Sequence, residues 1–239
     1  MTEKLQKVLA RAGVGSRRQM EQWIEYGRVK VNGQPAHVGM RVDDSATILV
    51  DEKRIDLSVS DTPKVIEYHK PVGEICTRHD NAGRPTVFDQ LPKLQHGRWV
   101  SVGRLDINTS GLLLLTTDGE LANKLMHPSQ EIEREYTCRV HGNVNDDTLK
   151  ELREGIALDG KKACFHHVEY RRGKGSNQWY HVILREGRYR EVRRLWEAVG
   201  CQVSRLVRIR YGIVKLPAQL QPGKWKTLSS SVVKRLTAL

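Results

Sequence analysis

The chain has 239 residues, enough for one large domain or two smaller ones, and Lys and Arg outnumber Asp and Glu by 40 to 28. The formal net charge of +12 favours a polyanionic partner, with nucleic acid the leading candidate and an anionic membrane surface the second. The longest apolar run is four leucines, far below the about 20 residues of a membrane span, and the charged N-terminus has no apolar signal core. We therefore predict a cytoplasmic protein with no membrane partner.

Two helices are predicted at the start of the chain. Leu5, Val8, Leu9 and Ala12 recur at helical spacing and give the first helix one apolar face. A capping-box pattern, S-x-x-Q over 16–19, predicts the start of a second helix, in which Met20, Trp23 and Ile24 face inward.

Short strands are predicted to follow these helices. Residues 29–31 and 47–50 are rich in β-branched side chains, and the Asn-Gly pair at 32–33 is typical of a tight turn. Residues 1–30 carry seven Lys or Arg against three Glu, whereas residues 31–60 carry three basic against five acidic side chains. The positive charge is thus concentrated on the helices. A solvated basic face and a DNA-reading helix-turn-helix are the alternatives, and the strands disfavour the second.

This N-terminal segment resembles the small RNA-binding domain shared with ribosomal small-subunit protein four, over about residues 3–50. The resemblance is carried by the sequence SRRQMEQWIEYGRVKVNGQPAHVGMRV at 16–42. In that family the basic helical surface contacts structured RNA. By position this implies RNA contacts from Lys7, Arg11, Arg17, Arg18, Arg28 and Lys30.

A polar stretch with a proline, residues 58–64, is predicted to link this module to a second domain. In that domain, the four leucines 112–115 form a run better suited to a doubly buried strand than to a helix. The polar loop 106–111 would then be fixed at the end of a rigid element, with Asp106 either a solvated turn residue or a functional carboxylate.

Two further segments carry candidate functional residues. Residues 134–140 alternate as a strand that places Tyr136 on the same face as Cys138 and Val140. In residues 186–200, Val192, Leu195, Trp196 and Val199 recur at helical spacing and predict a buried helical face. Arg190, Arg193 and Arg194 lie on another face, with Glu197 a possible ion partner of Arg193. Taken alone, this arginine-rich helix fits RNA contact and solvation equally well.

Four cysteines are spread along the chain without a C-x-x-C spacing: Cys76, Cys138, Cys164 and Cys201. This spacing argues against a zinc site and against a disulfide framework, so we expect reduced, buried thiols. Without a phosphate-binding loop, a G-x-G-x-x-G motif or metal-ligand spacing, we expect no metal and no cofactor. The histidines His166 and His167 are expected on the surface.

The segments of the second domain, in their order, resemble the pseudouridine synthase superfamily, in particular its branch that modifies bacterial ribosomal RNA. The matching motifs are YHKPVGEICT (68–77), GRLDINTSGLLLLTTDGELANKLMHP (103–128), EREYTCRV (133–140) and EGRYREVRRLWEAVG (186–200). The resemblance implies isomerisation of a uridine in ribosomal RNA, with large-subunit (23S) RNA or a pre-ribosomal particle as the partner. We expect the protein to act as a monomer.

The resemblance also implies roles for individual residues. Asp106 would be the essential carboxylate, either as nucleophile on the ribose or as the base that starts glycal formation. Both routes need it ionised, and Arg193, or failing that Arg194, would keep it charged and oriented. Tyr136 would stack on the flipped uracil and could help to remove its carbon-5 proton. Additional contacts to substrate or RNA are expected from Arg104, Arg188, Arg190, Arg194 and Arg208, whereas Tyr189 departs from the polar residue of many relatives.

For architecture we predict an α+β protein with a small N-terminal α/β RNA-binding module at 1–60. A larger catalytic domain at 61–239 would be built on a mixed, mainly antiparallel sheet with a central cleft; the sheet is implied by the resemblance. The alternative function is a non-catalytic RNA-binding factor for ribosome assembly, which would not need Asp106, Tyr136 and Arg193 together. A glycosylase is disfavoured because hydrolysis usually needs a second carboxyl group.

Overall fold

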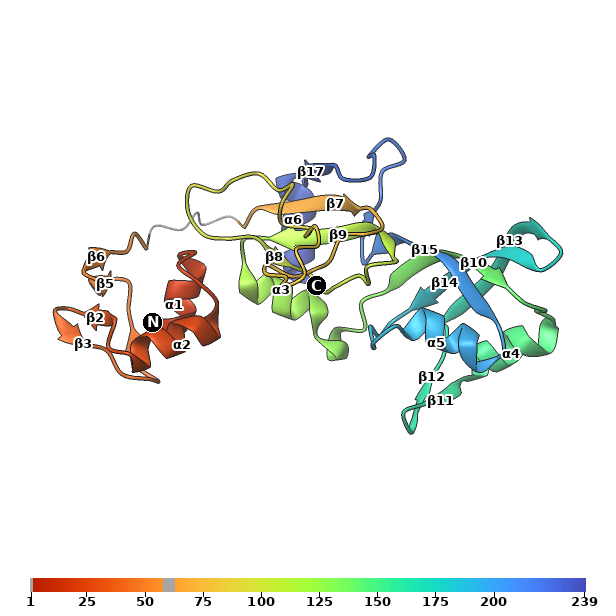
Figure 1. The fold of residues 1–239 in the computed structure, drawn as a ribbon, viewed down its shortest axis with the longest axis horizontal. Coiled ribbons are helices and arrows are strands. Elements are labelled where there is room, and N and C mark those ends of the chain that lie inside the picture. Colours follow the sequence, from red (N-terminus) through yellow and green to blue (C-terminus); the bar gives the residue numbers. More distant parts are fainter. Residues whose placement is uncertain (1, 58–62) are drawn as a thin grey trace. The chain divides into compact units, whose positions relative to one another are not determined.

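The computed structural model describes residues 2–57 and 63–239, which fall into two compact units (Figure 1). The first unit consists of Met1–Pro63 with Pro92–Val100 and Thr117–Gly119, and the second of Lys64–Leu91, Ser101–Thr116 and Glu120–Leu239. Of the predicted linker at 58–64, residues 58–62 lie outside the described residues.

The first unit contains the two predicted helices, α1 (Leu5–Arg11) and α2 (Arg17–Glu25). The predicted capping box is present, because the Ser16 hydroxyl accepts a hydrogen bond from the backbone N–H of Gln19 at 3.1 Å. The apolar faces of both helices meet in a common core that includes Leu9, Met20 and Ile24. This burial stabilises helices that are too short to persist alone.

Short strands complete the core of this unit. A four-stranded sheet has the order β3-β2-β5-β6, and β1 pairs separately with β4. The turn between β2 and β3 holds Asn32 and Gly33 at positive φ, as the Asn-Gly pair predicted. The bounds are β1 Glu3–Lys4, β2 Val29–Val31, β3 Gln34–Pro35, β4 Arg41–Val42, β5 Ile48–Val50 and β6 Lys53–Arg54.

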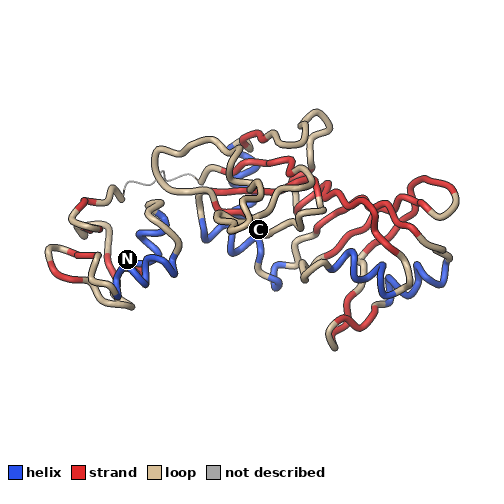
Figure 2. Tube along the Cα trace, viewed as in Figure 1, coloured by secondary structure: helices blue, strands red, loops and turns tan. Residues whose placement is uncertain are grey.

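The second unit is organised by a nine-stranded sheet whose main path is β13-β14-β10-β15-β9-β7-β17. The strands are drawn in red in Figure 2. Every pairing along this path is antiparallel except that of β9 with β15, so the predicted mixed, mainly antiparallel sheet is confirmed. The strands are β7 Val65–Lys70, β8 Val100–Ser101, β9 Ser110–Thr116, β10 Arg134–His141, β13 His167–Lys174, β14 Asn177–Leu184, β15 Gln202–Tyr211, β16 Val214–Lys215 and β17 Trp225–Thr227. A separate hairpin pairs β11 Ile156–Leu158 with β12 Lys161–Ala163.

Strand β9 holds the four leucines 112–115, all fully buried, which confirms the predicted doubly buried strand. Gly111 at its start has φ +107°, and a Cβ atom built there would lie 2.2 Å from the Arg208 carbonyl oxygen. Only glycine lets β9 approach β15 this closely. The parallel pairing places the loop that precedes β9 next to residues of β15.

Helices cover one face of the strands β10, β13, β14 and β15: α4 (Asp146–Glu154) and α5 (Glu191–Ala198) lie along the same side in Figure 1. Trp196 of α5 packs against Tyr180 of β14 with ring centroids 4.9 Å apart. The remaining helices are α3 Gly119–Met126, the 3₁₀ turn Pro128–Gln130 and α6 Ser230–Ala238. No helix within 2–57 or 63–239 has the length and apolar character that crossing a membrane requires.

All four cysteines are free thiols, but the prediction that all are buried is wrong. Cys138 and Cys201 are buried, Cys76 is half-buried, and Cys164 is exposed. Cys164 lies just beyond the end of β12, between the buried Ala163 and Phe165, and its own side chain faces solvent.

Candidate active site

A cavity of about 930 Å³ lies within the second unit and is the expected central cleft. Asp106 and Tyr136, which are 30 positions apart in the chain, both line it. The strand β10 brings Tyr136 to the cavity, and the loop before β9 brings Asp106. The structure thus places together the two residues that the sequence motifs singled out.

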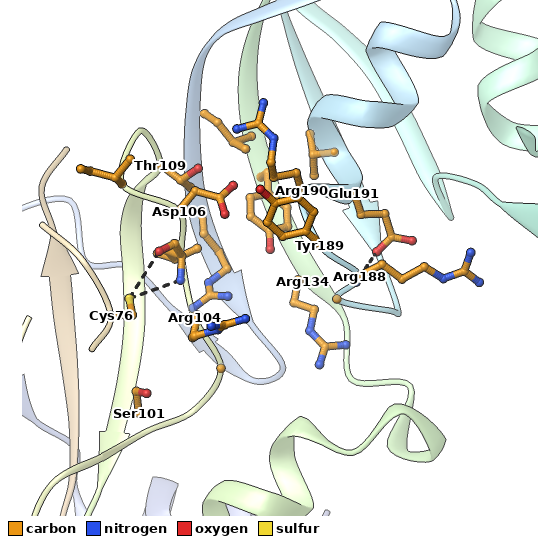
Figure 3. Close-up of a pocket in the computed structure, with 18 of the residues that line it drawn as sticks. Cys76, Ser101, Arg104, Asp106, Thr109, Arg134, Arg188, Tyr189, Arg190 and Glu191 are labelled. Atoms are coloured by element: carbon orange, nitrogen blue, oxygen red, sulfur yellow. Dashed lines mark hydrogen bonds between the residues drawn. The ribbon is translucent and has the colours of Figure 1, made fainter. Parts of the chain in front are cut away.

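The loop that carries Asp106 is fixed by backbone contacts. The Thr109 N–H donates to the Asp106 carbonyl at 3.0 Å, and the Gly73 N–H donates to the Ile107 carbonyl at 2.9 Å. The Leu105 N–H and the Cys76 sulfur approach to 3.4 Å (Figure 3). One contact within the loop and two contacts from Gly73 and Cys76 therefore hold the half-buried Asp106 at the cavity.

Lys70 supports the same loop from inside the fold. This fully buried side chain donates hydrogen bonds to the Pro71 carbonyl at 2.9 Å and to the Thr109 carbonyl at 2.8 Å. Burial lowers the pKa of Lys70, and the nearby charges of Cys76, Glu74 and Asp106 oppose that change. Lys70 was not among the predicted site residues.

Arg193 is buried at 7% exposure, although the sequence placed it on a polar helix face. Its guanidinium donates to the Val203 carbonyl at 2.6 Å and to the Asn108 carbonyl at 2.9 Å. Burial lowers the pKa of Arg193, and the negative charge of Asp106 counteracts this lowering. Arg193 therefore interacts with Asp106 through its charge while it holds the adjacent backbone; within the described residues, no ion pair shorter than 4 Å joins the two.

The neighbouring arginine has a different environment. Arg194 is half-buried and forms an ion pair of 2.7 Å with the exposed Asp159. Glu197 pairs with Arg190 at 3.6 Å, so its predicted pairing with Arg193 is wrong. The packing of α5 against β15 turns Arg193 inward and leaves the other two arginines near the surface.

Four carboxylates line the cavity: Asp80, Asp106, Glu186 and Glu191. Asp80 is held by Arg84 at 2.6 Å, which lowers the pKa of Asp80 to about 2. Glu186 pairs with Arg188 at 2.5 Å, and Glu191 accepts the Arg188 backbone N–H at 3.1 Å. Among residues 2–57 and 63–239, nothing hydrogen-bonds or forms an ion pair with the Asp106 carboxylate, which leaves it available to a substrate.

Two buried arginines add positive charge to the cavity wall. Arg208 is 3% exposed and donates from Nε to the Leu112 carbonyl at 2.7 Å. Arg134 donates to the Ile132 carbonyl at 2.7 Å and to the Tyr211 hydroxyl at 3.1 Å. Sequence reasoning missed Arg134, although its spacing of two from Tyr136 in a strand places both side chains on one face.

The mouth of the cavity is lined by the exposed Arg104, the half-buried Arg188 and Arg190, and Tyr189 (Figure 3). Tyr189 is 73% exposed and lines the same cavity as Asp106. Arg188 also donates to the Lys162 carbonyl at 2.9 Å. Of the predicted RNA contacts in this unit, only Arg194 lies off the cavity lining.

The predicted RNA-binding residues of the first unit fall into two groups. Lys7 and Arg11 pair with Glu3, Arg28 pairs with Asp51, and Lys30 pairs with Glu52. Arg17 and Arg18 are exposed in the first turn of α2, and no acidic group within the described residues lies within 4 Å of either one. These two arginines present the free positive charge of α2.

Over 2–57 and 63–239, no group of three or more His, Cys, Asp or Glu side chains is arranged to hold a metal ion. His166 and His167 are about half exposed, as expected of surface residues.

Two protein-family models match parts of this chain. The family model described as RNA pseudouridylate synthase matches residues 64–198, and the S4 domain model matches residues 3–56. Curated relatives called ribosomal large subunit pseudouridine synthase B are 55% identical over 243 residues. That of Yersinia pestis covers 100% of this chain and 76% of its own length, and that of Escherichia coli K12 covers 100% and 84%.

Solved structures give the same result for the fold. A structure described as the crystal structure of pseudouridylate synthase has a TM-score of 0.67, is 26% identical, and covers 98% of this chain and 99% of its own. The archaeal box H/ACA sRNP Nop10–Cbf5 complex matches the fold over 67% of this chain with a TM-score of 0.50. The chain belongs to the RNA pseudouridylate synthase family.

Proposed function

We propose that the protein isomerises uridine to pseudouridine in ribosomal RNA and that Asp106 is the essential carboxylate. The proposal rests chiefly on one observation: of the four carboxylates that line the cavity, Asp106 alone lacks a hydrogen bond or ion pair from the described chain. The names of the relatives support large-subunit ribosomal RNA as the substrate.

The reaction breaks the bond from ribose to the uracil nitrogen and rejoins the ribose to carbon 5 of the same base, from which a proton leaves. Positive character develops at the anomeric carbon, as in glycosidases. Asp106 attacks that carbon or removes the proton that starts glycal formation. The detached base returns as the reactant, so a second carboxylate to activate water is not needed.

Arg193 keeps Asp106 ionised and oriented. An arginine near a carboxyl group favours its charged form, whereas burial favours its neutral form. The guanidinium of Arg193 grips the Asn108 carbonyl at 2.9 Å, two residues beyond Asp106. Its charge and its position therefore act on the same loop.

Tyr136 supplies a surface for the flipped uracil. Its side chain is 9% exposed and lines the cavity, which suits stacking on an extruded base. Extrusion costs a few kcal/mol, which stacking and phosphate contacts offset. Arg104, Arg188 and Arg190 at the mouth, with Arg208 in the wall, contact the substrate nucleotide and its phosphates.

The N-terminal module, residues 1–60, provides a second hold on the RNA, and residues 61–239 form the catalytic domain. Arg17 and Arg18 of α2 carry free charge near a helix N-terminus, where backbone N–H groups also favour phosphate. The protein would work on ribosomal RNA or a pre-ribosomal particle in the cytoplasm, as a monomer. A non-catalytic assembly factor would have no use for an unpaired Asp106.

The test is tritium release from ribosomal RNA labelled at carbon 5 of uridine. Isomerisation exchanges this hydrogen, whereas binding alone does not. We expect release by the parent protein and by Asp147→Asn, an exposed carboxylate on α4, but none by Asp106→Asn. Asp106→Asn should bind RNA within a few-fold of the parent. No release by folded, RNA-bound parent from free RNA or pre-ribosomal particles would overturn the proposal.

A further inference from the structure

A second, shallow groove of about 550 Å³ lies on the sheet of the second unit. Its lining residues are Thr137, Arg171, Arg172, Trp179, His181, Val207 and Ile209. They come from the four neighbouring strands β13, β14, β10 and β15. The groove shares no lining residue with the active-site cavity.

The groove lies on the face of the sheet opposite to that of the active-site residues. Side chains alternate between the two faces along a strand. Tyr136 of β10 and Arg208 of β15 line the active-site cavity, whereas their neighbours Thr137 and Val207 line the groove. Thr137 and Val207 are register partners, so both strands present the same face here.

One row of register partners across this face is strongly basic. Arg172 on β13 is the partner of Trp179 on β14, and Trp179 is the partner of Arg139 on β10. Arg139 is in turn the partner of Arg205 on β15. At about 4.8 Å per strand, this row places one tryptophan among three arginines over roughly 14 Å.

The three arginines of this row carry charge that the chain does not neutralise. Arg172 stacks over the Trp179 ring with its guanidinium 5.7 Å from the ring centroid, and Arg139 donates to the Ser204 hydroxyl at 2.8 Å. Arg172 and Arg205 are exposed. Within the described part of the chain, none of the three has an acidic group within 4 Å.

The acidic groups on the same face are already paired. Glu135 accepts hydrogen bonds from Arg210 and lies 2.5 Å from His181, and Glu169 pairs with Arg171 at 3.2 Å. Burying a row of three like charges against the protein itself would be unfavourable. The unpaired charge of the exposed Arg172 and Arg205 therefore faces solvent.

We propose that this groove and the adjoining row of register partners, whose Arg139 and Arg205 lie beyond the groove lining, bind a single-stranded segment of RNA outside the target nucleotide. A base would stack on Trp179, and the adjoining phosphates would pair with Arg172, Arg139 and Arg205. Aromatic side chains flanked by arginines are the usual platform for single strands, because every base presents a π-face. The inference rests on the proposed function in taking RNA, rather than an acidic peptide, as the partner.

The first test uses an oligoadenylate of about 12 nucleotides, which contains no uridine and so cannot be a substrate. Arg172→Gln/Arg205→Gln is compared with a control pair of the same charge change, Arg153→Gln/Arg235→Gln. Both control arginines are exposed, on α4 and α6. All variants are full-length proteins whose folding is checked by circular dichroism.

We expect Arg172→Gln/Arg205→Gln to weaken oligoadenylate binding by about 10-fold. The slope of log K against log salt concentration should fall in magnitude by about 1.4, since each lost phosphate contact accounts for about 0.7. The control pair should stay within two-fold. On a short stem-loop substrate, both pairs should keep the parent kcat. Equal losses in both pairs, or no loss in either, would overturn the inference.

The second test probes stacking. Trp179→Phe keeps an aromatic face and should bind oligoadenylate within a few-fold of the parent, whereas Trp179→Leu should bind about 10-fold more weakly. Equal affinities of the two variants would overturn the stacking role. Oligoadenylate binding is independent of isomerisation, so tritium release can fail while this binding persists, and the reverse.

Discussion

The buried ammonium group of Lys70 donates a hydrogen bond of 2.8 Å to the backbone carbonyl of Thr109, three residues beyond Asp106. Lys70 ends β7, whereas Thr109 directly precedes β9, so this contact joins the two strands at the base of the active-site loop. A buried ammonium without hydrogen-bond acceptors would be strongly unfavourable. The loop carbonyls therefore stabilise Lys70, and Lys70 in turn fixes the loop.

Replacing Lys70 with Met should slow turnover by at least about 10-fold, since a misplacement of about 1 Å at a reacting group has large effects. The buried Thr109 carbonyl would lose its donor at a cost of about 1–3 kcal/mol, and the part-buried Pro71 carbonyl would lose one as well. We expect kcat to fall with little change in the KM for RNA. The exposed Lys215→Met is the control and should alter stability by less than about 0.5 kcal/mol. An unchanged kcat in Lys70→Met would refute the positioning role.

Arg193→Lys and Arg194→Lys distinguish the two arginines that could act on Asp106. Lysine keeps the charge but lacks the planar guanidinium, whose two terminal nitrogens donate to the Val203 and Asn108 carbonyls. Arg193→Lys should lose about 2 kcal/mol of stability, equivalent to a Tm lower by about 4–8 °C, together with most of its activity. Arg194→Lys, on a partly exposed ion pair, should behave as the parent. The reverse order would make Arg194 the functional partner.

Tyr136→Phe keeps the ring and removes only the hydroxyl. RNA binding should persist, because stacking needs only the ring. Product formation should become slower, because the hydroxyl would no longer help to remove the carbon-5 proton. The measurements are single-turnover rates and RNA affinity. Tyr170→Phe, on the exposed part of β13, provides the matched control. If Tyr136→Phe has parent kinetics, the hydroxyl has no part in the reaction.

Glu191→Gln should raise stability at alkaline pH. Burial raises the pKa of Glu191, so folding favours its protonated form. Below the ordinary glutamate pKa of about 4.3, the side chain is protonated in the folded and the unfolded protein, so its ionisation does not lower the stability. As pH rises through the folded-state pKa, the buried charge destabilises the protein, and glutamine removes that cost.

We therefore expect Glu191→Gln to have a higher Tm than the parent at pH 8 and the same Tm at pH 4. The exposed Glu151→Gln on α4 should show no such pH dependence. A Tm difference that is constant across pH would mean that the effect arises from packing and not from ionisation.

Deleting residues 1–60 should weaken ribosomal RNA binding more than it destabilises the rest of the chain. The first unit has its own core, and the second unit has its own sheet. Circular dichroism and RNA affinity of the truncated protein are the measurements. Arg17→Gln/Arg18→Gln in the full chain should also weaken RNA binding, but less than the deletion does. Loss of the folded signal in the truncated protein would contradict the proposed boundary.

Local sequence patterns predicted much of the fold. The capping box at Ser16, the Asn-Gly turn, the leucine strand 112–115 and the alternation in 134–140 all appear in the structure. Each pattern follows from the geometry of a single helix, turn or strand, which neighbouring residues determine by themselves. The sequence motifs also predicted that Asp106 and Tyr136 share one site, and both line one cavity.

The tertiary structure decided which side chains serve that site from a distance. Periodicity grouped Arg193 with Arg190 and Arg194, yet Arg193 alone turns inward, to carbonyls of Val203 and Asn108. Lys70 ends a strand of otherwise ordinary appearance, and its partner lies 39 positions away. The burial of a charged side chain depends on which distant backbone groups can accept its hydrogen bonds. Those acceptors exist only once β7, β9, β15 and α5 have packed together.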